Sequence, residues 1–150
     1  MFYIKEEIIL PEISLSDDFE IIIMMGYPGS GKSTIAKHIS DTNDKYVVIS
    51  GDIHKTIPKM KKASLEYIGN KSIVFDATHS SIKKRLEYIN FARKHNYSVK
   101  CIHVATSMDI SYKRNKYRSN KKQVPRIAYY VYRKHYEEPN EDEGFELVSI

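Results

Sequence analysis

Hydrophobic positions along the chain alternate between short β-branched runs and longer stretches with helical spacing. The run at residues 19–25 is typical of a strand that is buried on both faces. Further strands are predicted at residues 45–50, 72–76 and 98–104, with a short last one at 145–150. Helices are predicted at 32–40, 59–68, 81–95, 108–117 and 125–136. This alternation predicts right-handed βαβ units, and therefore an α/β fold with a central parallel sheet flanked by helices.

Helix boundaries and faces follow from single residues. Asp52 follows the second strand and is expected to be a helix N-cap, while Pro58 is expected to interrupt the chain before the helix at 59–68. Within the helix at 81–95, apolar residues recur at the spacing of one helix face and are expected to face the core. These residues are Ile82, Leu86, Ile89 and Ala92.

Length and composition favour a single domain. The chain has 150 residues, so we expect an acidic leader at 1–18 and one domain at 19–150. No apolar run approaches the ~18–20 residues that a membrane span needs, so no membrane partner is expected. Cys101 is the one cysteine, which excludes an intrachain disulfide and favours a reducing intracellular setting, cytoplasmic or nuclear.

One motif predicts a phosphate-binding loop. The sequence Gly-Tyr-Pro-Gly-Ser-Gly-Lys-Ser at 26–33 fits G-x-x-x-x-G-K-[ST], and it lies between a predicted buried strand and a predicted helix. Its glycines allow backbone N–H groups to wrap a polyphosphate, and Lys32 is expected to reach the terminal phosphates. The Ser33 hydroxyl is expected to bind Mg²⁺. The nucleotide-binding residues predicted from the motif are Gly26, Tyr27, Pro28, Gly29, Ser30, Gly31, Lys32 and Ser33.

Two carboxylates are predicted at the ends of neighbouring strands, where ligands of an open parallel sheet bind. Asp52 and Asp76 suit a kinase, which needs one carboxylate to accept the proton of the acceptor hydroxyl and another to orient a metal's water shell or a binding side chain. Lys55 lies one helical turn after Asp52, where it could hold a phosphate of the acceptor. The alternatives are a helix cap for Asp52, a turn-forming aspartate for Asp76 and an ordinary solvated lysine.

The positive charge is concentrated in a basic segment, residues 111–136. It holds nine Lys and Arg residues, six tyrosines and no acid, in a chain whose net charge is +5. Arg114, Lys116 and Arg118 are placed to form a lid over a triphosphate, and the other cations and aromatic rings could hold a nucleic-acid strand. The alternative is a solvated helix face with tyrosines packed in the core.

These motifs together resemble the 5′-hydroxyl polynucleotide kinases, and most closely the kinase half of bifunctional polynucleotide kinase/3′-phosphatases. The resemblance rests on residues 26–34, Asp52, residues 75–79 (Phe-Asp-Ala-Thr-His), residues 115–118, Val124 and Pro125, residues 132–136 and the closing Glu-Gly-Phe at 143–145. It implies a P-loop kinase fold with a basic helical lid, and ATP-dependent phosphorylation of 5′-hydroxyl ends of DNA or RNA during strand-break repair.

The resemblance also implies roles for single residues. It places Lys32, Ser33 and Thr34 on ATP and Mg²⁺, makes Asp52 the general base, and puts Arg118 in the lid with Lys116 and Arg114. Lys55, Asp76, Thr78 and His79 fall on the acceptor side. Three positions depart from the family pattern, namely Gly51, His79 and Lys116, where the family often has Arg, Asn and Arg. No phosphatase nucleophile motif occurs in the chain, so a 3′-phosphatase partner would be a separate domain or protein.

Three other functions remain open from the sequence. The chain could be a P-loop kinase of a small metabolite, or a nucleoside triphosphate hydrolase or switch that binds nucleic acid without modifying it. The third, a non-catalytic binding module, is disfavoured by the intact pair of Lys32 and Ser33.

Overall fold

The computed structural model describes residues 12–119 and 123–150. The proposed leader therefore lies outside the described residues from position 1 to 11, as do two cations of the basic segment, Lys121 and Lys122. The strands are β1 (Glu20–Met25), β2 (Tyr46–Ser50), β3 (Ser72–Asp76), β4 (Ser98–His103) and β5 (Glu146–Ser149). The α-helices are α1 (Lys32–Thr42), α2 (Gly51–His54), α3 (Ile57–Ser64), α4 (Ile82–Lys94), α5 (Met108–Lys116) and α6 (Arg126–His135), and two short 3₁₀ helices are η1 (Leu65–Tyr67) and η2 (Glu141–Glu143).

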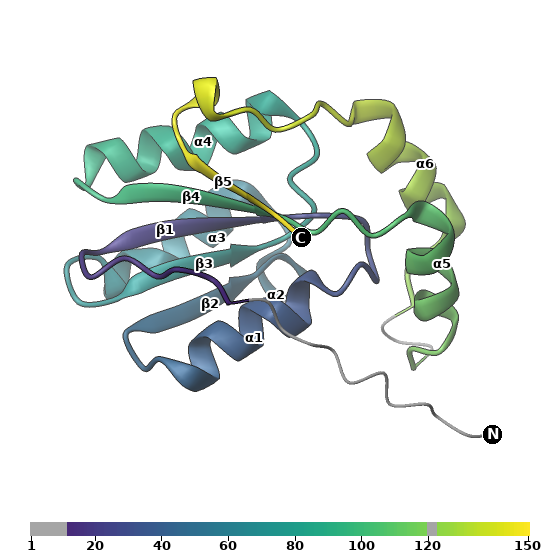
Figure 1. Ribbon diagram of the computed structural model, residues 1–150, viewed down its shortest axis with the longest axis horizontal. Coiled ribbons are helices and arrows are strands. Elements are labelled where there is room, and N and C mark those ends of the chain that lie inside the picture. The colour runs from purple at the N-terminus through teal and green to yellow at the C-terminus, as the bar shows by residue number, and fades with distance from the viewer. Residues whose placement is uncertain (1–11, 120–122) are drawn as a thin grey trace.

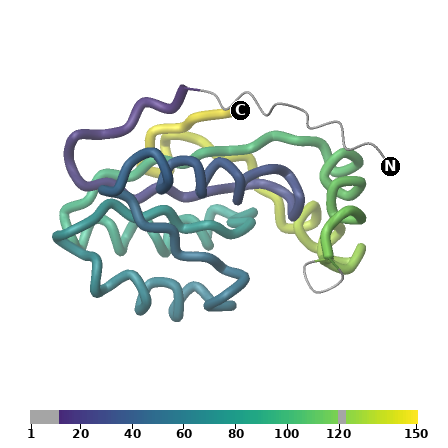
Figure 2. Tube along the Cα trace, turned by 90° about the horizontal axis from the view of Figure 1, so that it is seen from below, coloured from purple at the N-terminus to yellow at the C-terminus, as the bar shows by residue number. Residues whose placement is uncertain are grey.

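The strands form one sheet in the order β2-β3-β1-β4-β5, and every neighbouring pair is parallel. This confirms the predicted α/β fold with a central parallel sheet (Figure 1). β1 lies in the middle, and all six of its residues are buried. Its side chains alternate between two cores, with Ile21 and Ile23 on the side of α3 and α4, and Ile22 and Met24 on the side of α1. Figure 2 shows these helices on opposite sides of the sheet.

The carboxyl ends of β1, β3 and β2 lie at the same edge of the sheet. Ser50 at the end of β2 is in register with Asp76 at the end of β3, and Ile23 in β1 is in register with Phe75. The loop after β1, Asp76 at the end of β3 and the start of α2 therefore meet at this edge. Helices α5 and α6 stand beyond the same edge, next to each other (Figure 1).

The helix that follows β2 differs from its prediction. Ser50, not Asp52, is the N-cap of α2, and its Oγ accepts a hydrogen bond from the Asp52 backbone N–H at 3.2 Å. Because the shorter serine side chain performs the capping, the Asp52 carboxylate is left free of that task. Pro58 does not interrupt the chain but lies in the first turn of α3, where its missing N–H costs no hydrogen bond. Thr56 caps that helix.

The prediction of which α4 residues face the core is also partly wrong. Ile89 and Ala92 are buried as expected, but Ile82 and Leu86 each expose 42% of their surface. Their places towards the core are taken by Arg85 and Tyr88, which are both fully buried. A hydrophobicity pattern misses this arrangement because it assigns every arginine to the solvent.

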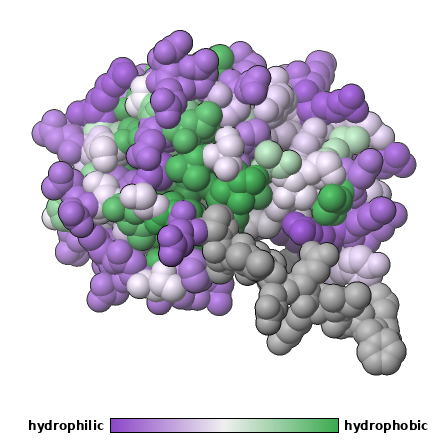
Figure 3. Space-filling view, in the orientation of Figure 1, coloured by the Kyte–Doolittle hydropathy of each residue, from purple (hydrophilic) through white to green (hydrophobic). Residues whose placement is uncertain are grey.

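The surface seen in the view of Figure 1 is mixed. Hydrophobic side chains gather over the middle of this face, and mostly hydrophilic side chains surround them (Figure 3). Within the described residues, no helix is long and apolar enough to cross a bilayer.

Candidate active site

A cavity of about 700 Å³ opens at the carboxyl edge of the sheet. Its walls come from the loop after β1, from α2 and α3, from the β3–α4 loop, from the start of α4, and from the basic segment. Nine of the site residues that the sequence predicts line it, and these are Pro28, Lys32, Ser33, Asp52, Lys55, Asp76, Thr78, His79 and Arg118. The fold thus brings the residues predicted for the donor side and those predicted for the acceptor side, which lie far apart in the sequence, around one space.

The phosphate-binding loop has the backbone geometry that its glycines allow. Gly29 and Gly31 adopt φ values of 77° and 101°, in the left-handed region. A Cβ on Gly29 would lie 2.5 Å from the backbone oxygen of Ser111 in α5, so the loop and the basic segment pack too closely for a side chain there. Pro28 lines the cavity, while Thr34 lies on the exposed side of the first turn of α1.

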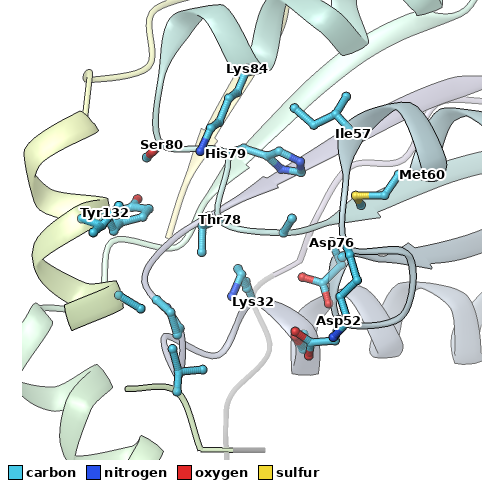
Figure 4. Close-up of a pocket in the computed structure, with 18 of the residues that line it drawn as sticks. Lys32, Asp52, Ile57, Met60, Asp76, Thr78, His79, Ser80, Lys84 and Tyr132 are labelled. Carbon is cyan, nitrogen blue, oxygen red and sulfur yellow. The ribbon is translucent and has the colours of Figure 1, made fainter. Parts of the chain in front are cut away.

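Lys32 is a buried cation at the centre of the site. Burial lowers the pKa of its ammonium group, the neighbouring carboxylates of Asp76 and Asp52 oppose that shift, and Arg118 adds to it. Figure 4 shows the Lys32 side chain between Thr78 and the two carboxylates. A polyanion entering the cavity would compensate this desolvated charge, as expected of a lysine that binds terminal phosphates.

The two carboxylates differ in their surroundings. Asp52 is exposed at the start of α2, whereas Asp76 is buried and its Oδ1 has no hydrogen-bond partner among the described residues. An unpartnered buried carboxylate oxygen is costly unless a cation or water satisfies it. Together with the Ser33 hydroxyl, this oxygen fits the hard oxygen ligands that Mg²⁺ prefers. Among the described residues there is no group of three or more His, Cys, Asp and Glu that could hold a metal ion.

Two of the residues predicted for the acceptor side have unusual backbone conformations. Lys55 and His79 have positive φ values of 70° and 46° although neither is a glycine. Such conformations cost free energy and cluster at functional sites. The His79 ring is buried, and both of its nitrogens have protein partners, namely the Met24 oxygen at 2.7 Å and the Tyr88 hydroxyl at 2.9 Å. His79 therefore shapes this wall, while direct binding of the acceptor through its ring nitrogens remains a prediction.

Tyrosines of the basic segment hold the phosphate-binding loop. The Tyr129 hydroxyl in α6 donates to the Pro28 oxygen at 2.6 Å. The ring of Tyr27 lies 6.0 Å from that of Tyr129 and 4.2 Å from that of Tyr132, measured between centroids. The alternative of a solvated face over packed tyrosines is thus correct for Tyr129 and Tyr132, which are buried, while Tyr130 is exposed.

The three predicted lid cations occupy different positions. Arg114 donates to the Ser30 oxygen at 3.2 Å and so lies at the phosphate-binding loop, although it does not line the cavity. Lys116 lies over the ring of Tyr112, with 4.9 Å from Nζ to the centroid, and it too stays outside the cavity wall. Arg118 alone of the three lines the cavity.

A side-chain clamp closes the loop that carries Arg118. The Asn115 amide donates to the Val124 oxygen at 2.8 Å, and the Val124 N–H donates back to Asn115 Oδ1 at 2.9 Å. Gln123 adds a hydrogen bond to the Arg118 oxygen at 2.9 Å. The ends of this loop are thereby fixed next to each other, which limits where Arg118 can reach.

Other residues that line the cavity were given no site role from the sequence, although Gly51, Ala77, Val124, Tyr132 and His135 lie at positions on which the family resemblance rests. The full set is Gly51, Thr56, Ile57, Met60, Ala77, Ser80, Lys84, Val124, Ala128, Val131, Tyr132 and His135. Lys84 and Tyr132 lie at the far end of the cavity from Asp52 (Figure 4). The helical spacing of Ala128, Val131 and His135 gives a weak signal, because the three share one face of α6. Nothing in the sequence indicates that this face borders the predicted site.

Comparison with known proteins places the chain among P-loop proteins. The family described as "AAA domain" matches residues 62–139. The bifunctional polynucleotide phosphatase/kinase of Schizosaccharomyces pombe is 34% identical over 138 residues, which cover 89% of this chain and 34% of that protein. A putative bifunctional polynucleotide phosphatase/kinase of Acanthamoeba polyphaga mimivirus is 34% identical over 137 residues, covering 87% of this chain and 32% of that protein.

These relatives confirm the resemblance expected from the motifs. The chain spans about a third of the length of the curated relatives that it matches. Among solved structures, a fungal RNA kinase superposes with a TM-score of 0.66 at 16% identity, covering 88% of this chain and 74% of that one. At that identity the likeness shows the shared fold alone.

Proposed function

The chain belongs to the AAA domain family of P-loop proteins, and on that premise we propose that it is an ATP-dependent kinase of the 5′-hydroxyl ends of DNA or RNA. The observation that carries the proposal is the shared cavity of Lys32 and Asp52. One side offers a buried cation and a loop of backbone N–H groups for a triphosphate, and the other offers an exposed carboxylate for a hydroxyl group. The names of the two curated relatives, which are polynucleotide phosphatase/kinases, support the same reaction.

The proposed mechanism assigns the proton to Asp52. Its carboxylate accepts the proton of the acceptor hydroxyl while the hydroxyl oxygen forms a bond to the γ-phosphorus of ATP, and the bond from that phosphorus to the β–γ bridging oxygen breaks to release ADP. Lys32 and Arg118 stabilise the negative charge on the transferring group. Positioning and electrostatics supply most of the rate in such reactions.

We propose that Ser33 and Asp76 hold Mg²⁺, Ser33 through its hydroxyl and Asp76 through the water shell of the ion. A bound Mg²⁺ neutralises phosphate charge and holds the phosphates in one geometry. The unpartnered Oδ1 of Asp76 supports this assignment.

A polynucleotide acceptor is favoured over a small uncharged metabolite by the charge around the cavity. Lys55 and Lys84 line its acceptor side, and the exposed cations Arg126, Arg133 and Lys134 continue along α6. The phosphodiester groups of a polynucleotide would find the cations Lys55 and Lys84 inside the cavity, and these would not serve an acceptor without charge.

We further propose that the protein acts inside the cell in strand-break repair, where a separate domain or protein supplies the 3′-phosphatase activity. Cys101 is the one cysteine of the chain, which supports a reducing setting, and burial raises the pKa of its thiol to about 12.

A transfer assay with γ-labelled ATP tests the proposal. The acceptors are 5′-hydroxyl oligonucleotides of DNA and of RNA, with a panel of small hydroxyl metabolites as the alternative class. We expect label on an oligonucleotide, and binding of that oligonucleotide should weaken steeply as salt rises. Label on a small metabolite only, or free phosphate only, would refute the proposal.

The variant Asp52→Asn tests the base. It should lower transfer roughly 10²- to 10⁴-fold while ATP affinity stays unchanged. The matched control is Asp41→Asn on α1, an exposed aspartate whose surface ion pair with Lys37 lies away from the cavity. Near-normal transfer by Asp52→Asn would remove Asp52 from its role.

A further inference from the structure

The largest fully buried side chain of the described residues is a charge that the proposed mechanism does not use. Arg85 projects from the first turns of α4 into the core and has no exposed surface. Its guanidinium forms a two-bond ion pair with Glu143, with Nε to Oε1 at 2.9 Å and Nη2 to Oε2 at 3.1 Å. Burying an ion pair is costly, so a contribution to stability does not by itself explain why this pair is present.

The other donors of Arg85 reach two segments that border the cavity. Nη1 donates to the backbone oxygen of His79 at 3.0 Å, in the β3–α4 loop. Nη2 donates to the backbone oxygen of Glu137 at 3.0 Å, two residues after the end of α6. The fifth N–H points to the Met25 sulfur at 3.6 Å, so every donor of the guanidinium has a partner.

The same two segments also bond to each other. The Glu137 N–H donates to the Ser80 oxygen at 2.8 Å, and the Glu137 carboxylate accepts from the Ile82 N–H at 3.3 Å. Arg85 connects the same two segments a second time, because its guanidinium donates to the backbone oxygens of both His79 and Glu137. These hydrogen bonds fix the distance between the loop at 78–80 and the carboxyl end of α6, and both segments line the cavity, the latter through Tyr132 and His135.

The donor side of the cavity is anchored by other contacts. The phosphate-binding loop is held by Tyr129 at Pro28, and by Thr106 and Arg114 at the Ser30 oxygen, with distances of 2.8 and 3.2 Å for the latter two. None of these hydrogen bonds involves Arg85. Arg85 bonds to the loop at 78–80 and to residue 137 after α6, and not to Tyr129, so displacing the guanidinium should move these two segments more than the phosphate-binding loop.

We propose that Arg85 is a positioning residue, held by Glu143, that sets the width of the acceptor side of the cavity between the loop at 78–80 and α6. This inference rests on the proposed function, because it assigns the effect to the 5′-hydroxyl acceptor. The planar fork of arginine is essential to it: a lysine has the same charge but cannot place separate donors on Glu143, His79 and Glu137 together.

The first test is Arg85→Lys, in the full chain, with separate titrations of ATP and of a 5′-hydroxyl oligonucleotide. We expect the KM for the oligonucleotide to rise roughly 10- to 100-fold, because the loss of one hydrogen bond to a charged group of the acceptor weakens binding by this order, and the Kd of ATP to stay within twofold. Arg93→Lys is the matched control, since it lies on the exposed side of the same helix and keeps its charge. It should behave like the wild type.

A second variant separates positioning from stability. Arg85→Met combined with Glu143→Leu replaces the ion pair by apolar side chains of similar size, which often leaves stability unchanged or raises it. We expect this variant to unfold at or above the temperature of Arg85→Lys, yet to retain the raised oligonucleotide KM, because the bonds to His79 and Glu137 are still missing.

The outcomes separate the two proposals. Wild-type kinetics in Arg85→Lys, or recovery of the oligonucleotide KM in the apolar double variant, would overturn the positioning role while leaving the kinase function intact. Equal losses in ATP and oligonucleotide affinity would overturn it too, since they would indicate general unfolding. No transfer by the wild-type protein to any oligonucleotide would refute the proposed function, and this inference with it.

Discussion

His79 makes the stability of the protein depend on pH. Its ring is buried between the Met24 oxygen and the Tyr88 hydroxyl, as a neutral imidazole that donates from Nδ1 and accepts at Nε2. Burial lowers the pKa of His79 to about 4, and the nearby cations of Lys32, Lys84 and Arg85 contribute to that shift, against the opposing hydrogen bond to Met24.

The size and sign of the effect follow from the two states of this residue. In the unfolded chain the imidazole has its ordinary pKa of 6.5, so between pH 6.5 and 4 the unfolded state binds a proton that the folded state does not. The free energy of unfolding therefore falls as the pH falls through this window. A difference of about 2.5 pKa units corresponds to about 3 kcal/mol in all, of which about 2 kcal/mol is already lost at pH 5.

Urea unfolding followed by circular dichroism, at pH 7.5 and at pH 5.0, measures this loss. The comparison protein is His79→Asn, because asparagine does not titrate and tolerates the left-handed backbone at this position. Between the two pH values, the wild type should lose about 2 kcal/mol more than the variant. The pKa of His103 is also lowered, mainly by burial, but its contribution is common to both proteins and cancels in the difference. Equal pH dependence of the two proteins would refute the reasoning.

Three further predictions concern the ATP side of the cavity. Gly29→Ala should destabilise the protein and abolish ATP binding, because a Cβ there would lie 2.5 Å from a backbone oxygen. Gly69 has a similar φ of 81° but lies in open space, so Gly69→Ala should lower the free energy of unfolding, measured by thermal unfolding, by only about 1 kcal/mol. Tyr129→Phe removes a buried hydroxyl donor, so it should lower the free energy of unfolding by roughly 1 kcal/mol and weaken ATP binding. Tyr130→Phe, on the exposed face, should leave the ATP affinity measured by calorimetry unchanged. Lys32→Met should abolish ATP binding and yet leave the melting temperature unchanged or higher, since it removes a charge that burial disfavours; a marked loss of stability would contradict this.

The sheet and its edge were predictable because hydrophobic runs and strand-end residues carry a strong signal. The run at 19–25 predicts the central strand correctly, since only a strand covered on both faces needs so many consecutive apolar side chains. From that strand and the glycine-rich motif, the parallel topology places Lys32, Asp52 and Asp76 at one edge. This placement follows from the strand ends and the parallel topology alone, without knowledge of side-chain conformations.

Residues whose role depends on a partner far away in the sequence could not be predicted. Arg85 has the same residue type as a solvated arginine, and only the folded chain brings Glu143 within reach, 58 residues away. Ser50 and Asp52 are both good capping residues, and the choice between them depends on where β2 ends. The tyrosines of α6 pack on the phosphate-binding loop because of how α6 folds back, and the sequence pattern gives only their helical spacing.

The origin of the two halves of the cavity also bears on how such a protein can change over evolutionary time. The proposed ATP cradle is built mainly from one continuous stretch, residues 26–34, whereas the proposed acceptor half is assembled from α2, α3, the β3–α4 loop and α6. Exchange of residues 51–64 in a descendant gene would therefore remodel part of the proposed acceptor half and leave residues 26–34 unchanged. An ancestor with this architecture could acquire new acceptor substrates through local recombination while it kept the same phosphate donor.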